Sequence, residues 1–282
     1  KKIIKSGRTH LKDAVPMTLG QEFSGYAYMI GREYAHIKDG AEYLRELNLG
    51  GTAIGTGINT SRNYKKIVFQ ELKKETKMQF RPAENLFEAT ASLGAIAAAH
   101  AALKVGAESL IKIANDLRLL SSGPATGFNE IEIPAVQPGS SIMPGKVNPA
   151  VAEMVGMVGF QVMGNDTTIA MCSQAGQLEL NVMMPLAAYT LLQSIDLLNH
   201  ASNIFAEHCI KGIKVNKKQC RIYVEKNPIL VTALTPYIGY QKAAKAAQRA
   251  YKEGKSIKEI VLQERLLDKK TVERILNPRK MF

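Results

Sequence analysis

The nine residues Ala95-Ile-Ala-Ala-Ala-His-Ala-Ala-Leu103 have almost only small side chains. They lie in a stretch from Asn85 to Ser121 that contains no proline, and alanine is the strongest helix former. A helix with small residues on every face lets other helices approach closely on all sides. The stretch therefore predicts a long helix at the centre of a helix bundle.

Four further helices are expected from apolar residues that recur at helical intervals: 18–47, 62–77, about 150–171 and about 182–209. The Gly/Thr-rich segment from Asn48 to Asn59 predicts a loop between the first two. Three glycines in the helix after residue 150 weaken it but permit close packing: Gly156, Gly159 and Gly164. A helix of thirty residues is about 45 Å long, too long for this chain to cover on its own. We therefore expect the apolar faces to pair with other copies of the chain.

The composition favours an all-α protein with a large core. Hydrophobic residues make up 46% of the chain, aromatic residues only 6%, and Trp is absent. The three cysteines are widely spaced and suggest neither disulfides nor a zinc site, so they predict buried thiols in a reducing cytoplasm. No signal peptide and no apolar run long enough to span a bilayer is visible. Because the sequence begins Lys-Lys-Ile-Ile, we expect it to be part of a longer chain.

Positive charge gathers in the last quarter of the sequence. Residues 214–282 hold 17 Lys/Arg against 6 Asp/Glu, and residues 1–213 are nearly balanced. The change to short, basic helices with proline-marked joints places a domain boundary near residue 213. A nucleic-acid-binding module is one hypothesis, with affinity that falls steeply with salt. The alternative is a solvated helix face, because the basic residues recur opposite alanines: Lys242, Lys245, Arg249 and Lys252 against Ala243, Ala247 and Ala250.

The loop Gln137-Pro-Gly-Ser-Ser-Ile-Met-Pro-Gly-Lys-Val-Asn-Pro149 carries the strongest chemical signal. Backbone N–H groups beside glycines can form a concave site for an anion, and Lys146 adds a full positive charge. The loop also leads into the helix that starts near Pro149, whose N-terminal dipole favours negative charge. It therefore fits a small carboxylate ligand. On composition alone, the alternative that this segment is an ordinary glycine- and proline-rich loop without a ligand remains equally good.

The run Gly139-Ser-Ser-Ile-Met-Pro-Gly-Lys-Val-Asn148 resembles the signature of the aspartase/fumarase superfamily without a gap. The likeness covers essentially the whole chain, with further similar stretches at 7–23, 48–59, 124–132, 164–183 and 210–281. It implies an all-α fold in which a long-helix bundle, 1–213, precedes a small, basic helical domain, 214–282. It also implies a homotetramer in which three subunits build each active site.

The resemblance implies a lyase that takes a proton from the carbon beside a carboxylate and expels an amine or a hydroxyl from the neighbouring carbon. Preorganised donors must stabilise the doubly charged intermediate. By the same resemblance, Ser140, the first serine of the signature, is the general base. A serine hydroxyl is a poor base unless its alkoxide is stabilised, and the glycine-flanked N–H groups and Lys146 offer that. The loop's glycines permit it to close over substrate. The plainer alternative is that Ser140 only hydrogen-bonds the loop.

The other site residues are also assigned by resemblance. Four match positions that hold the substrate carboxylates: Thr9, Ser141, Lys146 and Asn148. His10 matches a substrate-facing histidine, and Glu153 matches the carboxylate that pairs with it. Judged without the motif, His10 is a surface residue and Glu153 an ordinary charge in a first helical turn. The remaining histidines are assigned to helix surface or satisfied core: His36, His100, His200 and His208.

Flanking sequence favours elimination of ammonia from L-aspartate to give fumarate. Four segments point that way: 115–118, 127–131, 164–168 and 175–183. Two others resemble class II fumarases, which act on malate: 22–26 and 181–189. The resemblance implies no cofactor, and no metal-ligand spacing is evident in the sequence. Some aspartases are activated by divalent cations, but the sequence does not indicate which residues would bind such a cation.

The superfamily's N-terminal portion, which supplies one of the three residue clusters of each site, has no match in this chain. We therefore expect the chain to be inactive by itself and the parent enzyme to be active. A third hypothesis is a scaffold that keeps the fold without catalysis. The intact signature argues against it for the parent.

Overall fold

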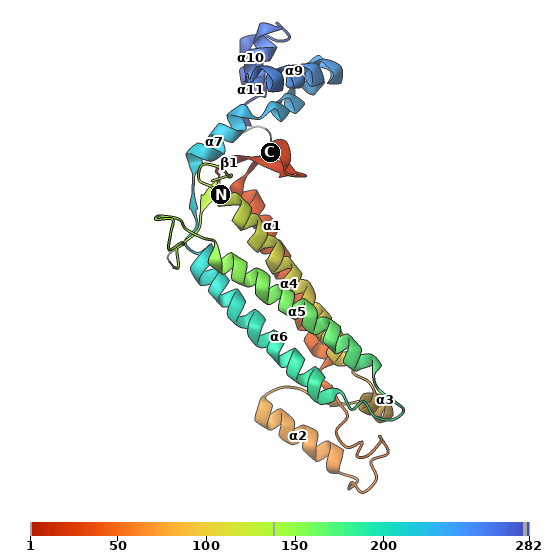
Figure 1. Cartoon of the computed structure of the whole chain (residues 1–282). Helices are drawn as coiled ribbons and strands as arrows, with labels where there is room; N and C mark the ends of the chain where they lie inside the picture. The colour runs from red at the N-terminus through yellow and green to blue at the C-terminus, as the bar shows by residue number, and fades with distance from the viewer. Residues whose placement is uncertain (1, 138, 279–280, 282) are drawn as a thin grey trace. The chain divides into compact units, whose positions relative to one another are not determined.

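The computed structural model describes residues 2–137, 139–278 and 281, and most of these are helical (Figure 1). The long helices are α1 (Leu19–Tyr43), α4 (Gly94–Leu120), α5 (Ala150–Gln174) and α6 (Met184–Phe205), which continues into the π-helix η1 (Ala206–Ile210). The shorter helices are α2 (Tyr64–Thr76), α3 (Leu86–Ala91), α7 (Lys217–Lys226), the 3₁₀-helix η2 (Pro228–Leu234), α8 (Thr235–Ile238), α9 (Tyr240–Glu253), α10 (Ile257–Gln263) and α11 (Lys269–Ile275). The all-α class expected from the sequence is confirmed.

Among the residues that the structure describes, short strands form three two-stranded sheets. The largest is an antiparallel hairpin of β1 (Ile4–Thr9) and β2 (Lys12–Thr18). The others are a parallel pair, β3 (Glu46–Leu47) with β4 (Arg81–Pro82), and an antiparallel pair, β5 (Ile131–Glu132) with β6 (Lys214–Val215).

The chain forms two compact units. The bundle unit comprises Tyr28–Arg118 and Ile133–Gly212, and the hairpin unit comprises Lys1–Ala27, Leu119–Glu132 and Ile213–Phe282. Residues 213–282 thus group with two earlier segments. The division into 1–213 and 214–282 stays a prediction about domains.

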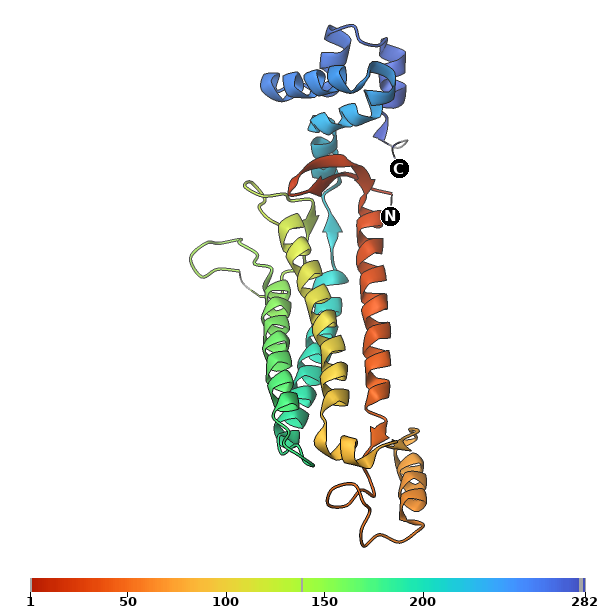
Figure 2. The ribbon, with the colours of Figure 1, turned by 90° about the vertical axis from the view of Figure 1, so that its right-hand side faces the viewer.

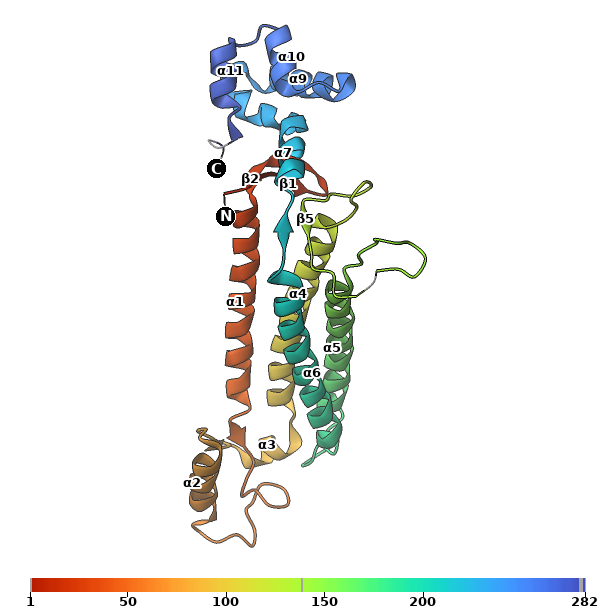
Figure 3. The ribbon, with the colours of Figure 1, turned by 90° about the vertical axis from the view of Figure 1, so that its left-hand side faces the viewer.

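In the bundle unit, α4, α5 and α6 run side by side, and the part of α1 that belongs to this unit runs along α4 (Figures 2 and 3). Their shared core contains these buried residues: Leu103, Ala107, Val162, Ile169, Leu191 and Leu198. The small side chains of α4 allow a close approach, because a Cβ at Gly40 of α1 would lie 3.2 Å from the Cβ of Ala102. This is the central position that the alanine-rich segment predicted.

Of the three glycines predicted to permit close packing in α5, Gly159 packs closely against another helix within the single chain, and packing of the other two stays a prediction. A Cβ at Gly159 would lie 2.5 Å from the side chain of Ile111 on α4, so any larger residue there would require that side chain to shift. Gly156 and Gly164 have nothing within 4 Å of a built Cβ. Helical periodicity places a glycine on a helix without showing which face the neighbouring helix covers.

Two predicted helices are shorter than expected. The helix predicted over 18–47 ends at Tyr43, because the next residues leave the helix to pair β3 with β4. The stretch 85–121 is split into α3 and α4 at Ser92, whose backbone is extended. The Ser92 hydroxyl accepts a hydrogen bond from the N–H of Gly94, as an N-terminal cap does.

A network of polar side chains lies inside the bundle unit, centred on the fully buried His100. The Nδ1 of His100 is 3.0 Å from Asp166, and its Nε2 is 2.8 Å from the Ser194 hydroxyl. Asp166 also accepts a hydrogen bond from Lys104 at 2.6 Å. Burial opposes ionisation of Asp166, but the hydrogen bonds from Lys104 and His100 outweigh it and lower the pKa of this carboxyl. His100 is thus a satisfied core residue, as expected.

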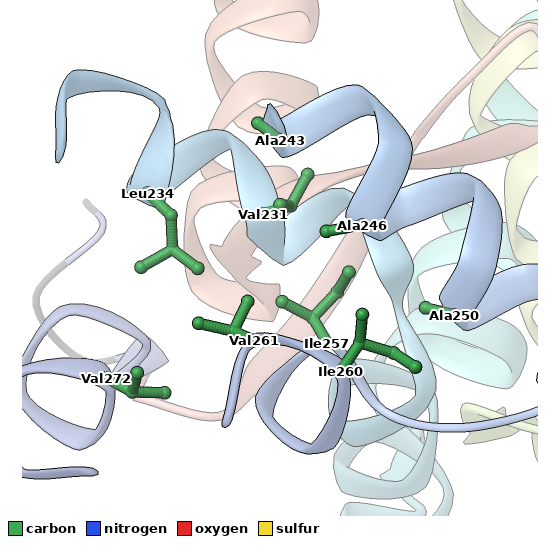
Figure 4. Packing of buried hydrophobic residues seen from close by; sticks show 9 residues of the cluster. All are labelled: Val231, Leu234, Ala243, Ala246, Ala250, Ile257, Ile260, Val261 and Val272. Atoms are coloured by element: carbon green, nitrogen blue, oxygen red, sulfur yellow. The ribbon is translucent and has the colours of Figure 1, made fainter. Parts of the chain in front are cut away.

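In the hairpin unit, the C-terminal helices share a core of nine buried residues (Figure 4): Val231, Leu234, Ala243, Ala246, Ala250, Ile257, Ile260, Val261 and Val272. Helix α9 buries its alanine face here and exposes Lys242, Lys245 and Lys252. The basic face of this helix is thus exposed in the single chain, as a solvated face and a nucleic-acid-binding surface would both require. No helix among the described residues is long and apolar enough to cross a membrane.

Candidate active site

The signature loop folds around the hydroxyl of Ser140. The Ser140 Oγ accepts hydrogen bonds from two backbone N–H groups, Ile142 at 3.3 Å and Met143 at 3.1 Å. Serine hydroxyls commonly accept hydrogen bonds from backbone N–H groups two or three residues later, in turns of this kind. Two amide donors directed at one hydroxyl oxygen favour the deprotonated form of that hydroxyl.

A tight turn follows at Met143-Pro-Gly-Lys146. The N–H of Lys146 donates to the carbonyl of Met143 at 3.2 Å, and Gly145 has a φ of +81°. Proline followed by glycine with positive φ is the arrangement of a type II turn. The turn leaves the Lys146 side chain exposed, so its ammonium group is accessible to an anion.

The loop is closed at its base by Gly139 and Asn148. The side-chain amide of Asn148 donates to the Gly139 carbonyl at 2.5 Å. The backbones also touch, because a Cβ at Gly139 would lie 1.7 Å from the Lys146 carbonyl oxygen. Asn148 keeps its carbonyl oxygen and a second N–H for another partner. Pro138, also part of the quoted loop, lies outside the described residues.

The loop runs directly into α5, a helix of 25 residues. Ser141 is exposed in the loop, and Glu153 lies in the first turn of α5. A Glu153 oxygen is 3.5 Å from the Nη2 of Arg118 on α4. This basic neighbour could not be predicted from the sequence, because the two residues are 35 positions apart. The predicted pairing of Glu153 with His10 stays a prediction.

Thr9 and His10 lie at the turn of the β1–β2 hairpin in the hairpin unit. Thr9 pairs with Lys12, so His10 and Leu11 are the two turn residues. Both have positive φ, +53° and +56°, as a type I′ turn requires. Few residues other than Gly, Asn and Asp adopt this conformation, and such strain often marks functional sites. His10 is exposed.

Among the described residues, no group of three or more His, Cys, Asp or Glu could hold a metal ion. The candidate groups described above are a serine that accepts hydrogen bonds from amides, a lysine, an amide side chain and a glutamate beside an arginine. Groups of these kinds can bind carboxylates and move a proton.

Comparison with family models gives two matches. Residues 1–164 match a family described as "Lyase", and residues 230–282 match one described as "Fumarase C C-terminus". The candidate loop lies wholly within the first match.

Two curated relatives illustrate the similarity in sequence. The chain is 51% identical over 281 residues to an aspartate ammonia-lyase of Pseudomonas fluorescens. The aligned region covers 99% of this chain and 59% of that protein. The chain is 48% identical over 282 residues to a class II fumarate hydratase of Helicobacter pylori, covering 100% of this chain and 61% of that protein. The chain thus spans about 60% of the length of these relatives.

Solved structures show the same fold. A class II fumarase from Schistosoma mansoni aligns with a TM-score of 0.96 at 40% identity, covering 99% of this chain and 61% of that chain. A fumarate lyase:delta crystallin from Brucella melitensis, solved with cobalt bound, aligns with a TM-score of 0.94 at 46% identity, covering 99% and 60%.

Proposed function

The chain belongs to the lyase family that matches residues 1–164, and from this premise we propose that the whole protein eliminates ammonia from L-aspartate to give fumarate. The aspartate ammonia-lyases among its relatives, at about 50% identity, support this choice of substrate. Because the chain spans about 60% of those relatives, the proposal concerns the full-length protein.

The observation that carries the proposal is the pair of amide donors at Ser140. A serine hydroxyl is a poor base because its alkoxide is unstable in water. The N–H groups of Ile142 and Met143 supply two hydrogen bonds that favour the alkoxide. In our proposal, Ser140 takes the proton from the carbon beside a carboxylate, and the donors of the loop stabilise the charge that develops.

The remaining candidate residues complete the proposed mechanism. The exposed ammonium of Lys146 neutralises one substrate carboxylate, since hydrogen bonds between an ammonium and a carboxylate are charge-assisted and strong. By their match to the family pattern, His10 is the proposed substrate-facing histidine, and Glu153 is the proposed carboxylate that pairs with such a histidine. The other proposed carboxylate-binding groups are hydroxyl and amide side chains: Thr9, Ser141 and Asn148.

We propose a homotetramer with shared active sites. Several large apolar side chains on the bundle helices are exposed in the single chain: Met157 and Phe160 on α5, and Tyr189 and Leu192 on α6. Burying such residues against another copy would remove apolar surface from water, which supports assembly. Light scattering of the full-length protein tests this, and a monomer at micromolar concentration would contradict it.

We also propose a cytoplasmic location, supported by three buried free cysteines.

A class II fumarase is the second candidate function. The Helicobacter pylori relative, at 48% identity, favours it. The proposed proton abstraction is common to both reactions, since only the leaving group differs. The assay therefore has to decide between them.

The decisive experiment supplies the full-length protein with L-aspartate and, separately, with L-malate, and follows the ultraviolet absorbance of fumarate. We expect fumarate from aspartate and little from malate. Turnover of malate without turnover of aspartate would transfer the assignment to fumarase. Turnover of neither would reject both.

The role of Ser140 is tested with a matched pair of neighbouring serines. Ser140→Ala removes the proposed base, so kcat should fall by roughly 10²- to 10⁴-fold. Ser141→Ala removes a proposed carboxylate contact, so KM should rise with a smaller loss in kcat. Urea unfolding should show that both variants remain folded. Near-normal kcat in Ser140→Ala would assign that serine to the loop's structure alone.

A further inference from the structure

A cluster of buried charges lies in the hairpin unit, outside the signature loop. Its centre is Glu130, which is fully buried just before β5. One oxygen of Glu130 is 3.0 Å from the Nζ of Lys5, and the other is 2.9 Å from the Nη2 of Arg8. Lys5, itself 1% exposed, also contacts Glu22 at 2.8 Å. The cluster is therefore electrically balanced, with two cations and two carboxylates.

The backbone of Glu130 is held on both sides. Its N–H donates to the carbonyl of Leu120 at 2.9 Å, and its carbonyl accepts from the N–H of Asn216 at 2.9 Å. Its side-chain oxygens meet Lys5 and Arg8 as ion pairs rather than as well-aligned hydrogen bonds. Glu130 is thus a fixed buried anion to which β1 is attached.

Arg8 is fixed by more than charge. Its guanidinium carbon lies 4.2 Å from the ring centre of Phe128 and 5.2 Å from that of Tyr223. Both distances are within the range of cation–π attraction, and the planar guanidinium can stack on aromatic rings. The residue directly before Thr9 is therefore held by a carboxylate and two rings.

The irregular shape of the β1–β2 hairpin lets the side chains of both Lys5 and Arg8 contact Glu130, and Arg8 lies next to the turn. In a regular strand, Lys5 and Arg8 would point to opposite faces. The pairing of β1 with β2 is irregular between Ser6 and Arg8, and a bulge of this kind re-aims side chains. Gly7 is needed at this irregularity, because a Cβ there would lie 2.9 Å from the Val15 carbonyl oxygen.

We propose that Glu130, through its contact with Arg8, is a positioning residue that holds the strained turn carrying Thr9 and His10 in place. This inference rests on the proposed function, in which both turn residues act on substrate. The turn contains two non-glycine residues with positive φ, which surrounding structure must hold. An anchor placed one residue before Thr9 meets that need, and small displacements of catalytic groups are costly in rate.

The first test does not depend on activity. Amide hydrogen exchange of residues 8–12 is measured in the full-length protein and in Glu130→Gln. We expect exchange at the turn to be at least about tenfold faster in the variant. Glu273→Gln is the matched control, because it breaks an exposed ion pair with Lys258 in the same unit and should leave the turn unchanged. Unchanged exchange in Glu130→Gln would overturn the proposal.

Glu130→Gln leaves buried positive charge in excess and can prevent folding. The double variant Lys5→Met/Glu130→Gln removes one charge of each sign and serves in that case. It still leaves Arg8 without its carboxylate. We expect its stability to recover relative to Glu130→Gln while the turn still exchanges fast. Protection of the turn equal to that of the unmodified protein would contradict the role of the Arg8–Glu130 contact.

The second test asks whether Glu130 acts through the two substrate-facing residues of the turn. Glu130→Gln should lower kcat/KM at least about tenfold. In a Thr9→Val/His10→Asn background, the same change should lower kcat/KM less than about twofold, because both groups being positioned are gone. Equal losses in both backgrounds would mean a general structural effect and overturn the proposal. If the full-length protein turns over neither aspartate nor malate, the proposed function fails, and the exchange experiment still decides whether Glu130 holds the turn.

Discussion

The side-chain amide of Asn148 donates a hydrogen bond to the carbonyl of Gly139, nine residues earlier, and so closes the base of the signature loop. This closure brings the backbone of Gly139 against that of Lys146. The amides that face Ser140 therefore lie in a loop whose two ends are tied together.

Gly139→Ala should disable the loop. Its Cβ would lie 1.7 Å from the Lys146 carbonyl oxygen, so the base of the loop must open. We expect kcat/KM to fall about 100-fold, as for other small displacements of catalytic groups. Gly145→Ala is the control in the same loop, because nothing lies within 4 Å of its Cβ and only backbone strain is added. Equal losses in both variants would contradict this account.

The carboxylate of Asp166 should make stability depend on acid pH. Its pKa is lowered in the folded state, so its contribution is present above the ordinary Asp pKa of about 3.9 and is lost as pH falls through the lower folded value. Asp166→Asn should therefore reduce the loss of stability between pH 6 and pH 3, measured as urea midpoints. Glu207→Gln breaks an exposed pair with Lys211 and should change this difference little. An identical acid loss in Asp166→Asn and the unmodified protein would rule the idea out.

Ile260→Ala should destabilise the C-terminal helices. Ile260 is fully buried among the other aliphatic residues of Figure 4. Truncations of this kind cost about 2–5 kcal/mol, through lost burial and the cavity that remains. Tyr251→Ala, at a site 82% exposed, should cost less than about 0.5 kcal/mol. Urea unfolding measures both, and a small effect at Ile260 would mean that the core repacks.

The buried thiols should be inert in the folded protein. Burial raises the pKa of Cys209 to about 11, and burial together with the nearby Glu130 carboxylate raises the pKa of Cys220 to about 11. Because the thiolate is the reactive form, a disulfide reagent at pH 8 should modify neither residue until the protein is unfolded in urea. Rapid labelling of Cys220 under native conditions would show that the region around Glu130 opens.

The long helices could be predicted because their signals are local. Alanine-rich sequence around His100 predicted a central helix, and the absence of proline set the length of the stretch. The break at Ser92 was missed, because a single serine and a glycine end one helix and begin the next through a cap. The end of α1 was missed because it depends on pairing with Arg81 and Pro82, distant in sequence.

The candidate loop was predictable in composition but not in detail. Glycines and Lys146 indicated an anion site, whereas the particular amides that face Ser140 follow from turn geometry. The anchor at Glu130 could not be predicted, since Lys5, Arg8 and Glu130 come together only through tertiary folding. No spacing rule links charges more than a hundred residues apart.

The hairpin unit is built from three separated segments of the chain, and this governs when it can form during synthesis. Asn227 of the last segment donates hydrogen bonds to the Ser6 hydroxyl and to the Ala14 carbonyl, and the first of these spans 221 positions. At about 5–20 residues per second, a ribosome needs roughly 10–45 s to make the intervening chain. Glu130, which pairs with Lys5 and Arg8, is made about halfway through that time, and Asn227 only at its end. The contacts of Asn227 with the β1–β2 hairpin are therefore formed well after the hairpin itself has been made.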